Sequence, residues 1–185
     1  MVEVHVNGIF ITQSKASGVI LKEENGERAL PIVIGEYEAQ SIAMALENFN
    51  PPRPITHDLA VNILKTLHIE IDSILISDLK DNTYYALIKL NKNGELFEVD
   101  ARPSDAIALA VRLGTTIFVN DSVMDEAGYV PDGSEKDLKD IKTVPETNDL
   151  DSLKEKLKKA VEEEDYEKAA ALRDEIKRIE KGMNK

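Results

Sequence analysis

The 185-residue sequence contains no cysteine, which excludes disulfides, thiolate-bound zinc, iron–sulfur clusters and cysteine nucleophiles. It also lacks any apolar run near the roughly 20 residues that a membrane helix needs. Residues 1–12 alternate apolar and polar side chains, which is typical of a strand and not of a signal peptide. We therefore expect a cytoplasmic protein that has no membrane partner and is stabilised by packing alone.

Basic residues are scarce. The sequence has 35 acidic and 23 basic residues, which gives a formal net charge of −12. From Asp149 onward there are 11 acidic and 10 basic residues, so almost all of the acidic excess lies before that point. Such a domain repels nucleic acid at long range, because nonspecific affinity comes mainly from Lys and Arg. Any function on nucleic acid therefore needs a local source of positive potential.

Several common catalytic motifs are also absent. The sequence has no Gly-x-x-x-x-Gly-Lys phosphate loop, no Gly-x-Ser-x-Gly elbow, no His-Glu-x-x-His helix and no dinucleotide fingerprint. The enzyme classes that depend on these motifs receive no support.

The residues that are present predict an α+β domain. Alternating and β-branched stretches predict strands at 3–11, 18–22, 29–34, 70–79, 83–91, 95–101 and 116–119. Helical spacing predicts helices at 36–48, 56–67, 103–114 and 121–127, with Thr56 and Ser104 as N-caps. Tight turns between consecutive strands imply antiparallel pairing. We expect a mixed, largely antiparallel sheet with helices packed on it.

Two of the predicted helices carry similar sequences. Residues 41–46 read Ser-Ile-Ala-Met-Ala-Leu, and residues 106–111 read Ala-Ile-Ala-Leu-Ala-Val. Each segment follows a group of predicted strands. The similarity is compatible with duplication of a unit of several strands and one helix. It is also short and rich in alanine, so duplication and chance similarity both stay open.

Residues 149–185 predict an antiparallel helical hairpin. Apolar residues recur every three or four positions on both sides of Glu163-Glu164-Asp165. Opposite charges four residues apart, such as Glu155 and Lys159, support each helix by about 0.2–0.5 kcal/mol per pair. A hairpin of this size cannot bury its own apolar stripe. It is therefore expected to dock on its own domain, to pair with a second copy or to bind a partner protein.

Three polar clusters lie where a predicted strand or loop becomes a helix. They are Gly35-Glu36-Tyr37-Glu38, Arg53-Pro54-Ile55-Thr56-His57-Asp58 and Asp100-Ala101-Arg102-Pro103-Ser104-Asp105. Carboxylates can bind a divalent metal ion that activates water, histidine can transfer a proton, and arginine can bind a phosphate in bidentate fashion. These groups suit phosphodiester hydrolysis. A metal ion would also supply positive potential to the acidic domain.

Each candidate has an expected role in that chemistry. We expect a site formed by His57, Arg53, Asp58, Arg102 and Asp105, in which the ligands of a Mg²⁺ or Mn²⁺ ion are Asp58, Asp105, Glu38 and Asp100. A purely structural interpretation stays open beside this one. Ser, Thr and acidic residues in a first helical turn are also what capping and the helix dipole favour. The arginines could equally bridge to backbone carbonyls or to the same carboxylates.

Taken together, three segments resemble the signature segments of the bifunctional nuclease family, formerly a domain of unknown function. The segments are Leu-Pro-Ile-Val-Ile-Gly at 30–35, Arg-Pro-Ile-Thr-His-Asp-Leu at 53–59 and Asp-Ala-Arg-Pro-Ser-Asp-Ala-Ile-Ala-Leu-Ala at 100–110. The resemblance extends over residues 3–120. It implies cleavage of both DNA and RNA by an α+β fold, with self-association into a dimer or a larger oligomer. It implies no catalytic mechanism, so the roles given to individual residues come from their chemistry.

A second resemblance concerns the predicted hairpin. Residues 165–176 read Asp-Tyr-Glu-Lys-Ala-Ala-Ala-Leu-Arg-Asp-Glu-Ile, which is similar to the UVR motif of excision-repair subunits and some chaperone-associated proteins. In those families the motif mediates protein contacts. We therefore expect a nuclease-like domain at 1–134, a linker at 135–148 and a UVR-like hairpin at 149–185.

These observations leave functions of three classes. The first is a metal-assisted nuclease for DNA and RNA with a protein-interaction hairpin. The second is a noncatalytic scaffold or regulatory adaptor, in DNA repair or proteostasis, that acts through the hairpin. The third, a module that binds a nucleotide or another small acidic ligand without turnover, has no motif in its favour.

Overall fold

The computed structural model describes residues 1–12, 15–131 and 173. The predicted linker lies outside these residues, and so does the predicted hairpin apart from Arg173. The described strands are β1 (Val2–Ile11), β2 (Ser17–Glu23), β3 (Ala29–Ile34), β4 (Glu70–Lys80), β5 (Thr83–Lys92), β6 (Glu95–Ala101) and β7 (Ile117–Val119). The described helices are α1 (Glu36–Leu46), α2 (Thr56–Thr66), α3 (Pro103–Leu113) and α4 (Asp121–Ala127). None of these helices is long and apolar enough to cross a membrane.

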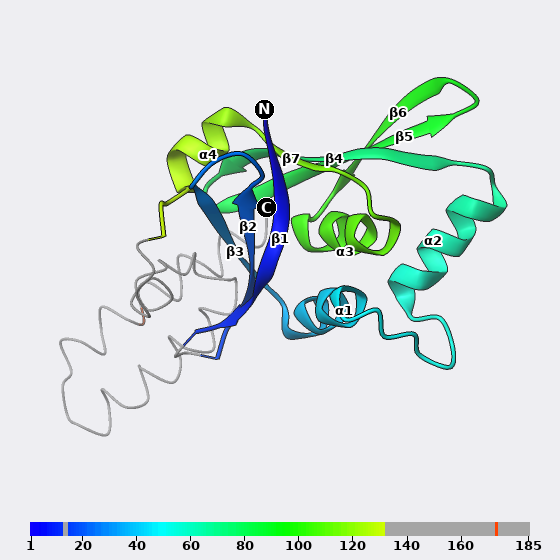
Figure 1. Cartoon of the computed structure of the whole chain (residues 1–185), viewed down its shortest axis with the longest axis horizontal. Helices are drawn as coiled ribbons and strands as arrows, with labels where there is room; N and C mark the ends of the chain where they lie inside the picture. The colour runs from blue at the N-terminus through cyan, green and yellow to red at the C-terminus, as the bar shows by residue number, and fades with distance from the viewer. Residues whose placement is uncertain (13–14, 132–172, 174–185) are drawn as a thin grey trace. The chain divides into compact units, whose positions relative to one another are not determined.

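The described strands form one sheet in the order β3-β2-β1-β7-β4-β5-β6. β4 and β7 pair in parallel, and the other neighbouring strands pair antiparallel. Figure 1 shows that the sheet is curled, so that β1–β3 run steeply across the direction of β4 and β5. The predicted α+β fold with a mixed, largely antiparallel sheet is therefore confirmed.

The sheet consists of two similar halves. β1, β2 and β3 form an antiparallel meander that is followed by α1, and β4, β5 and β6 form a second meander that is followed by α3. The first strand of each meander, β1 or β4, lies beside β7 in the middle of the sheet. The similar sequences at 41–46 and 106–111 thus lie in corresponding helices. This is the arrangement that a duplicated unit would give, although duplication itself stays a prediction.

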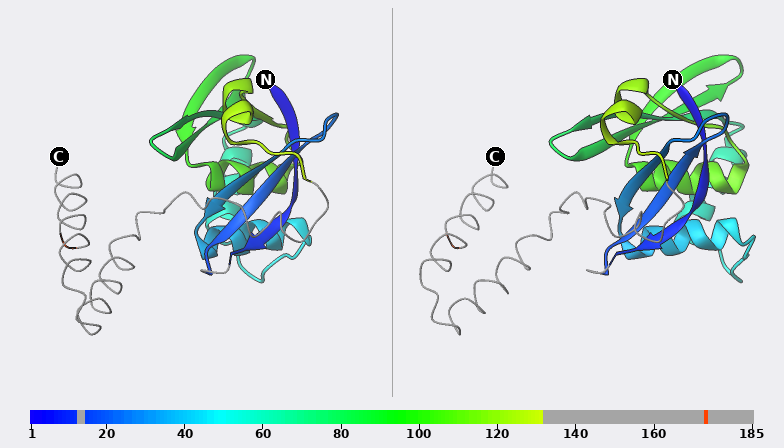
Figure 2. Two further views of the ribbon diagram at one scale, coloured as in Figure 1. Left: turned by 90° about the vertical axis from the view of Figure 1, so that its left-hand side faces the viewer. Right: turned by 60° about the vertical axis from the view of Figure 1, so that its left-hand side comes forward.

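α3 is the central helix, and its burial determines where α1 and α2 lie. Ala106, Ile107 and Ala108 have no exposed surface, and Ala110 is almost completely buried. The helix packs against α1 and α2 as well as against β4 and β5 (Figures 1 and 2). Alanine allows neighbouring helices to approach closely, because interaxial distance depends on the side chains at the contact. The core therefore holds three helices together at one side of the sheet.

The structure corrects two predicted N-caps. Thr56 is the first residue of α2, and the N-cap is Ile55. Ser104 lies inside the first turn of α3, where it is buried, and the N-cap is Arg102. At α2 the helix start is stabilised differently, because the Ile55 backbone N–H donates to the carboxylate of Asp58 at 3.1 Å. A side chain inside the first turn thus replaces the expected hydroxyl cap.

Candidate active site

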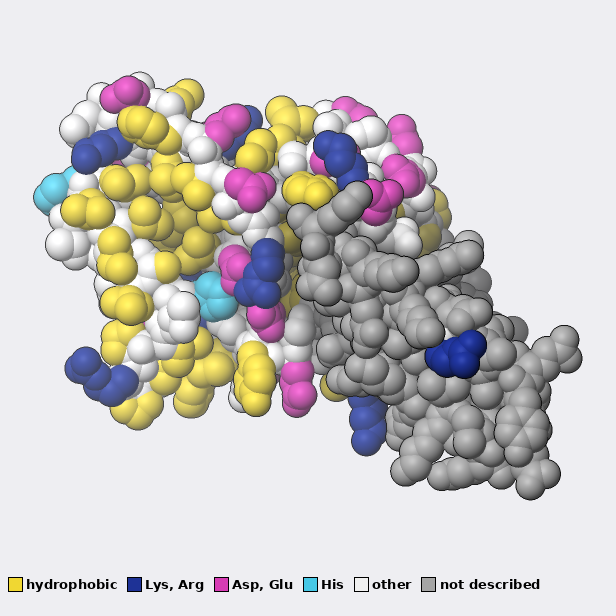
Figure 3. All heavy atoms as spheres, turned by 180° about the vertical axis from the view of Figure 1, so that it is seen from behind, with side chains coloured by type: hydrophobic (Ala, Val, Ile, Leu, Met, Phe, Trp, Pro, Cys, Tyr) yellow, Lys and Arg dark blue, Asp and Glu magenta, His cyan; other side chains and the backbone are white. Residues whose placement is uncertain are grey.

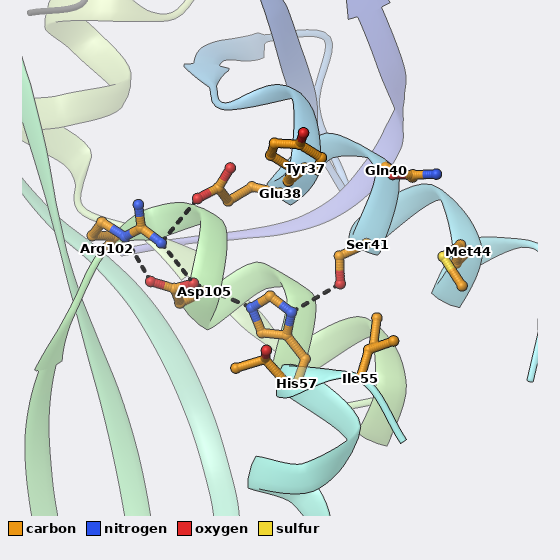
Figure 4. Close-up of a pocket in the computed structure, with 10 residues that line it drawn as sticks. Tyr37, Glu38, Gln40, Ser41, Met44, Ile55, His57, Arg102 and Asp105 are labelled. Carbon is orange, nitrogen blue, oxygen red and sulfur yellow. Dashed lines mark hydrogen bonds and ion pairs between the residues drawn. The ribbon is translucent and has the colours of Figure 1, made fainter. Parts of the chain in front are cut away.

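The first turns of α1, α2 and α3 line one hollow with a volume of about 500 Å³. Its lining residues are Tyr37, Glu38, Gln40, Ser41, Met44, Ile55, Thr56, His57, Arg102 and Asp105. Figure 4 shows that Glu38, Ser41, His57, Arg102 and Asp105 point toward one another there. A helix N-terminus carries unpaired backbone N–H groups and a partial positive charge, so it favours anions. The hollow thus combines three helix starts with one arginine, Arg102, and two carboxylates, Glu38 and Asp105.

Arg102 joins two carboxylates at one side of the hollow. Its Nε donates to Asp105 Oδ2 at 2.8 Å, and its Nη2 donates to Asp105 Oδ1 at 3.1 Å. The same Nη2 lies 3.0 Å from Glu38 Oε1. The Arg102 side chain is 66% exposed, so the guanidinium remains accessible to a ligand in the hollow. This geometry leaves one cation, held between two anions, at the solvent side of the site.

His57 lies between Asp105 and Ser41. Its Nε2 is 3.1 Å from Asp105 Oδ1, and its Nδ1 is 2.8 Å from Ser41 Oγ. Burial by itself would raise the pKa of the Asp105 carboxyl, but hydrogen bonds from Arg102 and then from His57 outweigh burial. The pKa of Asp105 is therefore lowered, and the carboxylate is ionised at neutral pH. An ionised carboxylate can only accept, so a neutral His57 carries its proton on Nε2 and accepts at Nδ1.

Arg112 closes the other end of this hydrogen-bond chain. Its Nε donates to Asp58 Oδ1 at 2.7 Å, and its Nη2 donates to Ser41 Oγ at 3.0 Å. Its Nη1 donates to the carbonyl oxygen of Ala108 at 3.0 Å. The Arg112 side chain is only 10% exposed. Polar contacts therefore run without a break from Asp58 through Arg112, Ser41, His57, Asp105 and Arg102 to Glu38, and they cross all three helices.

The structure brings together four of the residues predicted for the site: Glu38, His57, Arg102 and Asp105 all line the hollow. Asp58 lies elsewhere, at a polar hollow of about 300 Å³ that it shares with Arg112. Arg53 is exposed and lines neither hollow. Asp100 is an exposed residue of β6 and pairs with Leu87.

Two residues of this hydrogen-bond chain, Ser41 and Arg112, are not among the site residues predicted from the sequence. Ser41 is 6% exposed and lies within an otherwise apolar helical stripe. In the similar segment of α3 the corresponding residue is Ala106. A hydroxyl in one copy where the other copy has alanine is the signal that could have identified Ser41. Arg112, in contrast, is an ordinary basic residue in a last helical turn, and nothing in the sequence indicates its partners.

The predicted metal ligands do not surround a common point. Glu38 and Asp105 are both ion-paired with Arg102, and Asp58 is ion-paired with Arg112. Across residues 1–12, 15–131 and 173, no three His, Asp or Glu side chains are grouped in a way that would hold a metal ion. A shared coordination sphere of Asp58, Asp105, Glu38 and Asp100 therefore does not fit this arrangement. The need for a metal ion stays a prediction that chelation tests.

The ion pair of Asp58 and Arg112 gives a prediction for stability. The hydrogen bond from Arg112 holds the pKa of Asp58 below its usual value, and the bond from Ile55 adds to this effect. Replacing Asp58 with asparagine should lower the free energy of unfolding at pH 7 by about 2 kcal/mol, because a charged hydrogen bond and the helix start are weakened. A carboxyl whose pKa is lowered by folding stabilises above its unfolded pKa of roughly 3.9. The difference should therefore vanish as pH falls through the lower, folded value.

Urea unfolding of both proteins between pH 7 and pH 2 measures this difference. Asp125→Asn is the matched control, because its partner Arg28 lies in an exposed pair in which the Asp125 side chain is 70% accessible. That control should change stability by less than about 0.5 kcal/mol. Equal losses for both variants would contradict the structural role of Asp58.

Comparison with known proteins gives two family matches. The model of the bifunctional nuclease domain matches residues 19–132, and the UvrB/uvrC motif matches residues 148–182. Uncharacterized protein Rv1829 of Mycobacterium tuberculosis strain H37Rv is 40% identical over 139 residues, which cover 74% of this chain and 83% of that protein. Bifunctional nuclease 1 of Oryza sativa subsp. japonica is 28% identical, over 85% of this chain and 53% of its own length. Bifunctional nuclease 1 of Arabidopsis thaliana is also 28% identical, with 85% and 54% covered. The chain thus spans about half the length of these plant relatives.

Proposed function

The chain belongs to the bifunctional nuclease domain family, and from this we propose that it hydrolyses phosphodiester bonds of DNA and RNA in the hollow between α1, α2 and α3. Both resemblances found in the sequence are confirmed by the family matches. The observation that carries the proposal is the hollow itself. One guanidinium, one carboxylate-bound histidine and the first turns of three helices meet in it.

Binding of phosphate is the first step of the proposed reaction. Asp105 and Glu38 hold the guanidinium of Arg102 at the rim of the hollow through Nε and Nη2, and Nη1 remains to donate to a phosphate oxygen. The helix N-termini add hydrogen-bond donors and positive potential at short range. Screening at physiological salt limits the repulsion expected from a net charge of −12 to roughly 8 Å, so contacts inside the hollow decide whether phosphate binds.

Proton transfer is the second step. His57 takes the proton of the attacking hydroxyl group and returns a proton to the leaving oxygen, as a general base and then a general acid. Asp105 fixes the ring through Nε2 and stabilises the imidazolium that forms. In this scheme Asp58 is a structural residue, and Arg53 and Asp100 have no part in the chemistry.

The direct test of the proposed function is an assay of purified full-length protein on single-stranded DNA, duplex DNA and RNA. His57→Ala protein, purified in the same way, serves as the control for contaminating nuclease. The expected result is cutting of DNA and RNA by the wild type alone. Equal cutting by both proteins, or none by either, would sink the proposal. Parallel reactions with EDTA, with Mg²⁺ and with Mn²⁺ test the predicted metal requirement.

The second family match supports an additional role in protein binding. Residues 148–182 match the UvrB/uvrC motif, and this match favours a helical module that recruits a protein partner. The same match favours the alternative function, a noncatalytic scaffold or regulatory adaptor that acts through the hairpin. A chain that ends before residue 148 should keep its nuclease activity, and loss of cutting in that variant would indicate that the motif has a catalytic part.

An apolar face over α2 and the β5–β6 hairpin suggests self-association. Leu59 and Ile63 of α2, Leu67 at its C-cap, and Phe97 and Val99 on one face of β6 are each at least 43% exposed. Figure 3 shows hydrophobic side chains gathered over this region. β6 lies at the end of the sheet formed by the described residues, and none of these residues pairs with its outer edge. We propose that a second copy covers this face, because two β6 edges can pair around a two-fold axis.

Charged substitutions on this face should produce a monomer. We expect Leu67→Lys/Phe97→Lys to sediment as a single chain while the wild type sediments as a dimer or a larger oligomer, because each lysine would have to be desolvated in the interface. Val130→Lys is the matched control, since Val130 is 56% exposed and lies outside this face. Analytical ultracentrifugation measures the masses. A monomeric wild type, or a double variant with unchanged mass, would contradict the proposed interface.

A further inference from the structure

We propose that Ser41 is the nucleophile of the reaction and that its Oγ forms a covalent phosphodiester with the substrate. This inference rests on the proposed function and names a catalytic residue that the family resemblance does not supply. Ser41, His57 and Asp105 are linked in that order by contacts of 2.8 and 3.1 Å. The same three residue types form nucleophilic triads on unrelated folds, where they are recognised by geometry and not by sequence position.

The positions of the protons single out Ser41. When His57 is neutral and Asp105 Oδ1 accepts from its Nε2, Nδ1 is the only ring nitrogen able to take up a proton. Ser41 Oγ lies 2.8 Å from Nδ1. The proton within reach of the base is therefore the hydroxyl proton of Ser41. A water molecule could take this place only by displacing the serine hydroxyl.

Arg112 favours the ionised form of the same hydroxyl. Its Nη2 donates to Ser41 Oγ at 3.0 Å, so Oγ accepts from Arg112 while it donates to His57. A fixed guanidinium beside the oxygen stabilises the negative charge that develops during proton removal. Asp58 and the Ala108 carbonyl hold this guanidinium from two other directions. A serine that served only to pack α1 against α3 would need neither the base nor the cation.

Ser41 is also placed at the cavity where the substrate would bind. Although only 6% of its surface is exposed, it lines the same hollow as Arg102, His57 and Asp105. Burial on the remaining sides keeps bulk water away from Oγ, which strengthens its interactions with the base and the cation. The hydroxyl is thus open toward the hollow and enclosed elsewhere.

The proposed reaction balances in two displacements. In the first, Ser41 Oγ attacks phosphorus, its proton passes to His57 Nδ1, and the bond to the leaving oxygen breaks as that oxygen takes the proton from His57. In the second, a water molecule gives a proton to His57 and attacks phosphorus, and Ser41 Oγ leaves with that proton. No oxidant or co-reactant is needed. The nucleophile belongs to the protein, so the reaction does not depend on a ribose 2′-hydroxyl and applies to DNA as well as RNA.

The stereochemical course at phosphorus tests this inference whether or not the intermediate accumulates. Each in-line displacement inverts phosphorus, so two displacements give retention and direct attack by water gives inversion. The probe is an oligonucleotide with one phosphorothioate of known configuration, cut by the wild-type full-length protein in ¹⁸O-labelled water. We expect retention. Inversion would overturn the assignment of Ser41 as nucleophile and leave the proposed nuclease function standing.

Substitution of Ser41 provides a second test of this assignment. Ser41→Ala should lower kcat by about 10³-fold or more while Arg112 stays paired with Asp58. Ser73→Ala is the matched control, because Ser73 is 8% exposed and lies in β4, away from the hollow. Unchanged thermal unfolding of Ser41→Ala would show that the loss is chemical. If Ser41→Ala retains activity within about threefold, the nucleophile is not Ser41, and if the wild type cuts nothing, the proposed function fails with it.

Discussion

Replacement of His57 with alanine is expected to lower kcat on both DNA and RNA by about 10³-fold, with little change in KM. The reason is that His57 is the only histidine lining the hollow in the described part of the chain, and its two ring nitrogens are already aligned with Ser41 and Asp105. Loss of the ring leaves phosphate binding by Arg102 intact and removes the path for the proton. Steady-state rates on a defined oligonucleotide measure both parameters.

His5→Ala provides the matched control. His5 lies in β1, its side chain is 46% exposed, and it contacts Glu24 at 2.6 Å, so it too is a histidine paired with a carboxylate. Its replacement should leave kcat within about twofold, since surface ion pairs contribute little. If both histidine variants keep wild-type rates, the hollow between the helices is not the active site. If His57→Ala and His5→Ala lose activity equally, the loss reflects lower stability of the folded protein and not a missing catalytic group.

The strands and helices of the described residues could be predicted from the sequence, because the periodicities that indicate them are local properties. The predicted ends of β3, β6 and α4 agree with the structure, and the other elements differ by a few residues. The caps were wrong for a physical reason. Thr56 and Ser104 have the right side chains for capping, but the extended residues are Ile55 and Arg102. The helices therefore start one residue earlier at α2, and two residues earlier at α3, than those caps would place them.

The site was harder to predict, as Asp58 and Asp105 show. Both are the third residue of a helix, and each follows a polar residue. The sequence therefore predicts a catalytic role equally well for either one. In the structure Asp105 contacts His57 in the hollow, whereas Asp58 contacts Arg112 and lines a second hollow. The difference is set by which surface of the central helix each one faces. That depends on packing between helices that are distant in the sequence, and no local pattern records it.

The same reasoning explains why one predicted arginine lies at the site and the other does not. Arg53 lies before α2 in a segment that contains Pro51, Pro52 and Pro54, and its side chain is exposed. Arg102 ends the extended segment after β6, at the point where α3 enters the core, and therefore points into the hollow. Both are followed by proline, so the sequence presents them alike. Only the burial of α3 separates their roles.

Replacement of Arg102 with methionine should lower kcat/KM on DNA by about 10²-fold, because the charged hydrogen bond to the phosphate is lost while the length of the side chain is kept. Arg102→Lys should recover part of this loss, since it restores the charge without the planar fork. Arg53→Met is the matched control and should stay within about twofold.

The two arginine variants together decide where phosphate binds. Arg102→Met also frees Asp105 and Glu38 from their shared cation, so their negative charges would then repel the substrate and add to the loss. Raising the salt concentration should reduce this added repulsion more than it changes the wild-type rate, because screening weakens exposed charges first. An equal loss of kcat/KM for Arg53→Met and Arg102→Met would instead show that the substrate responds to the overall charge of the protein and not to one arginine. A loss confined to Arg53→Met would move the phosphate to the segment before α2. Only a loss confined to Arg102→Met agrees with attack on a phosphate held at the rim of the hollow, beside His57 and Ser41.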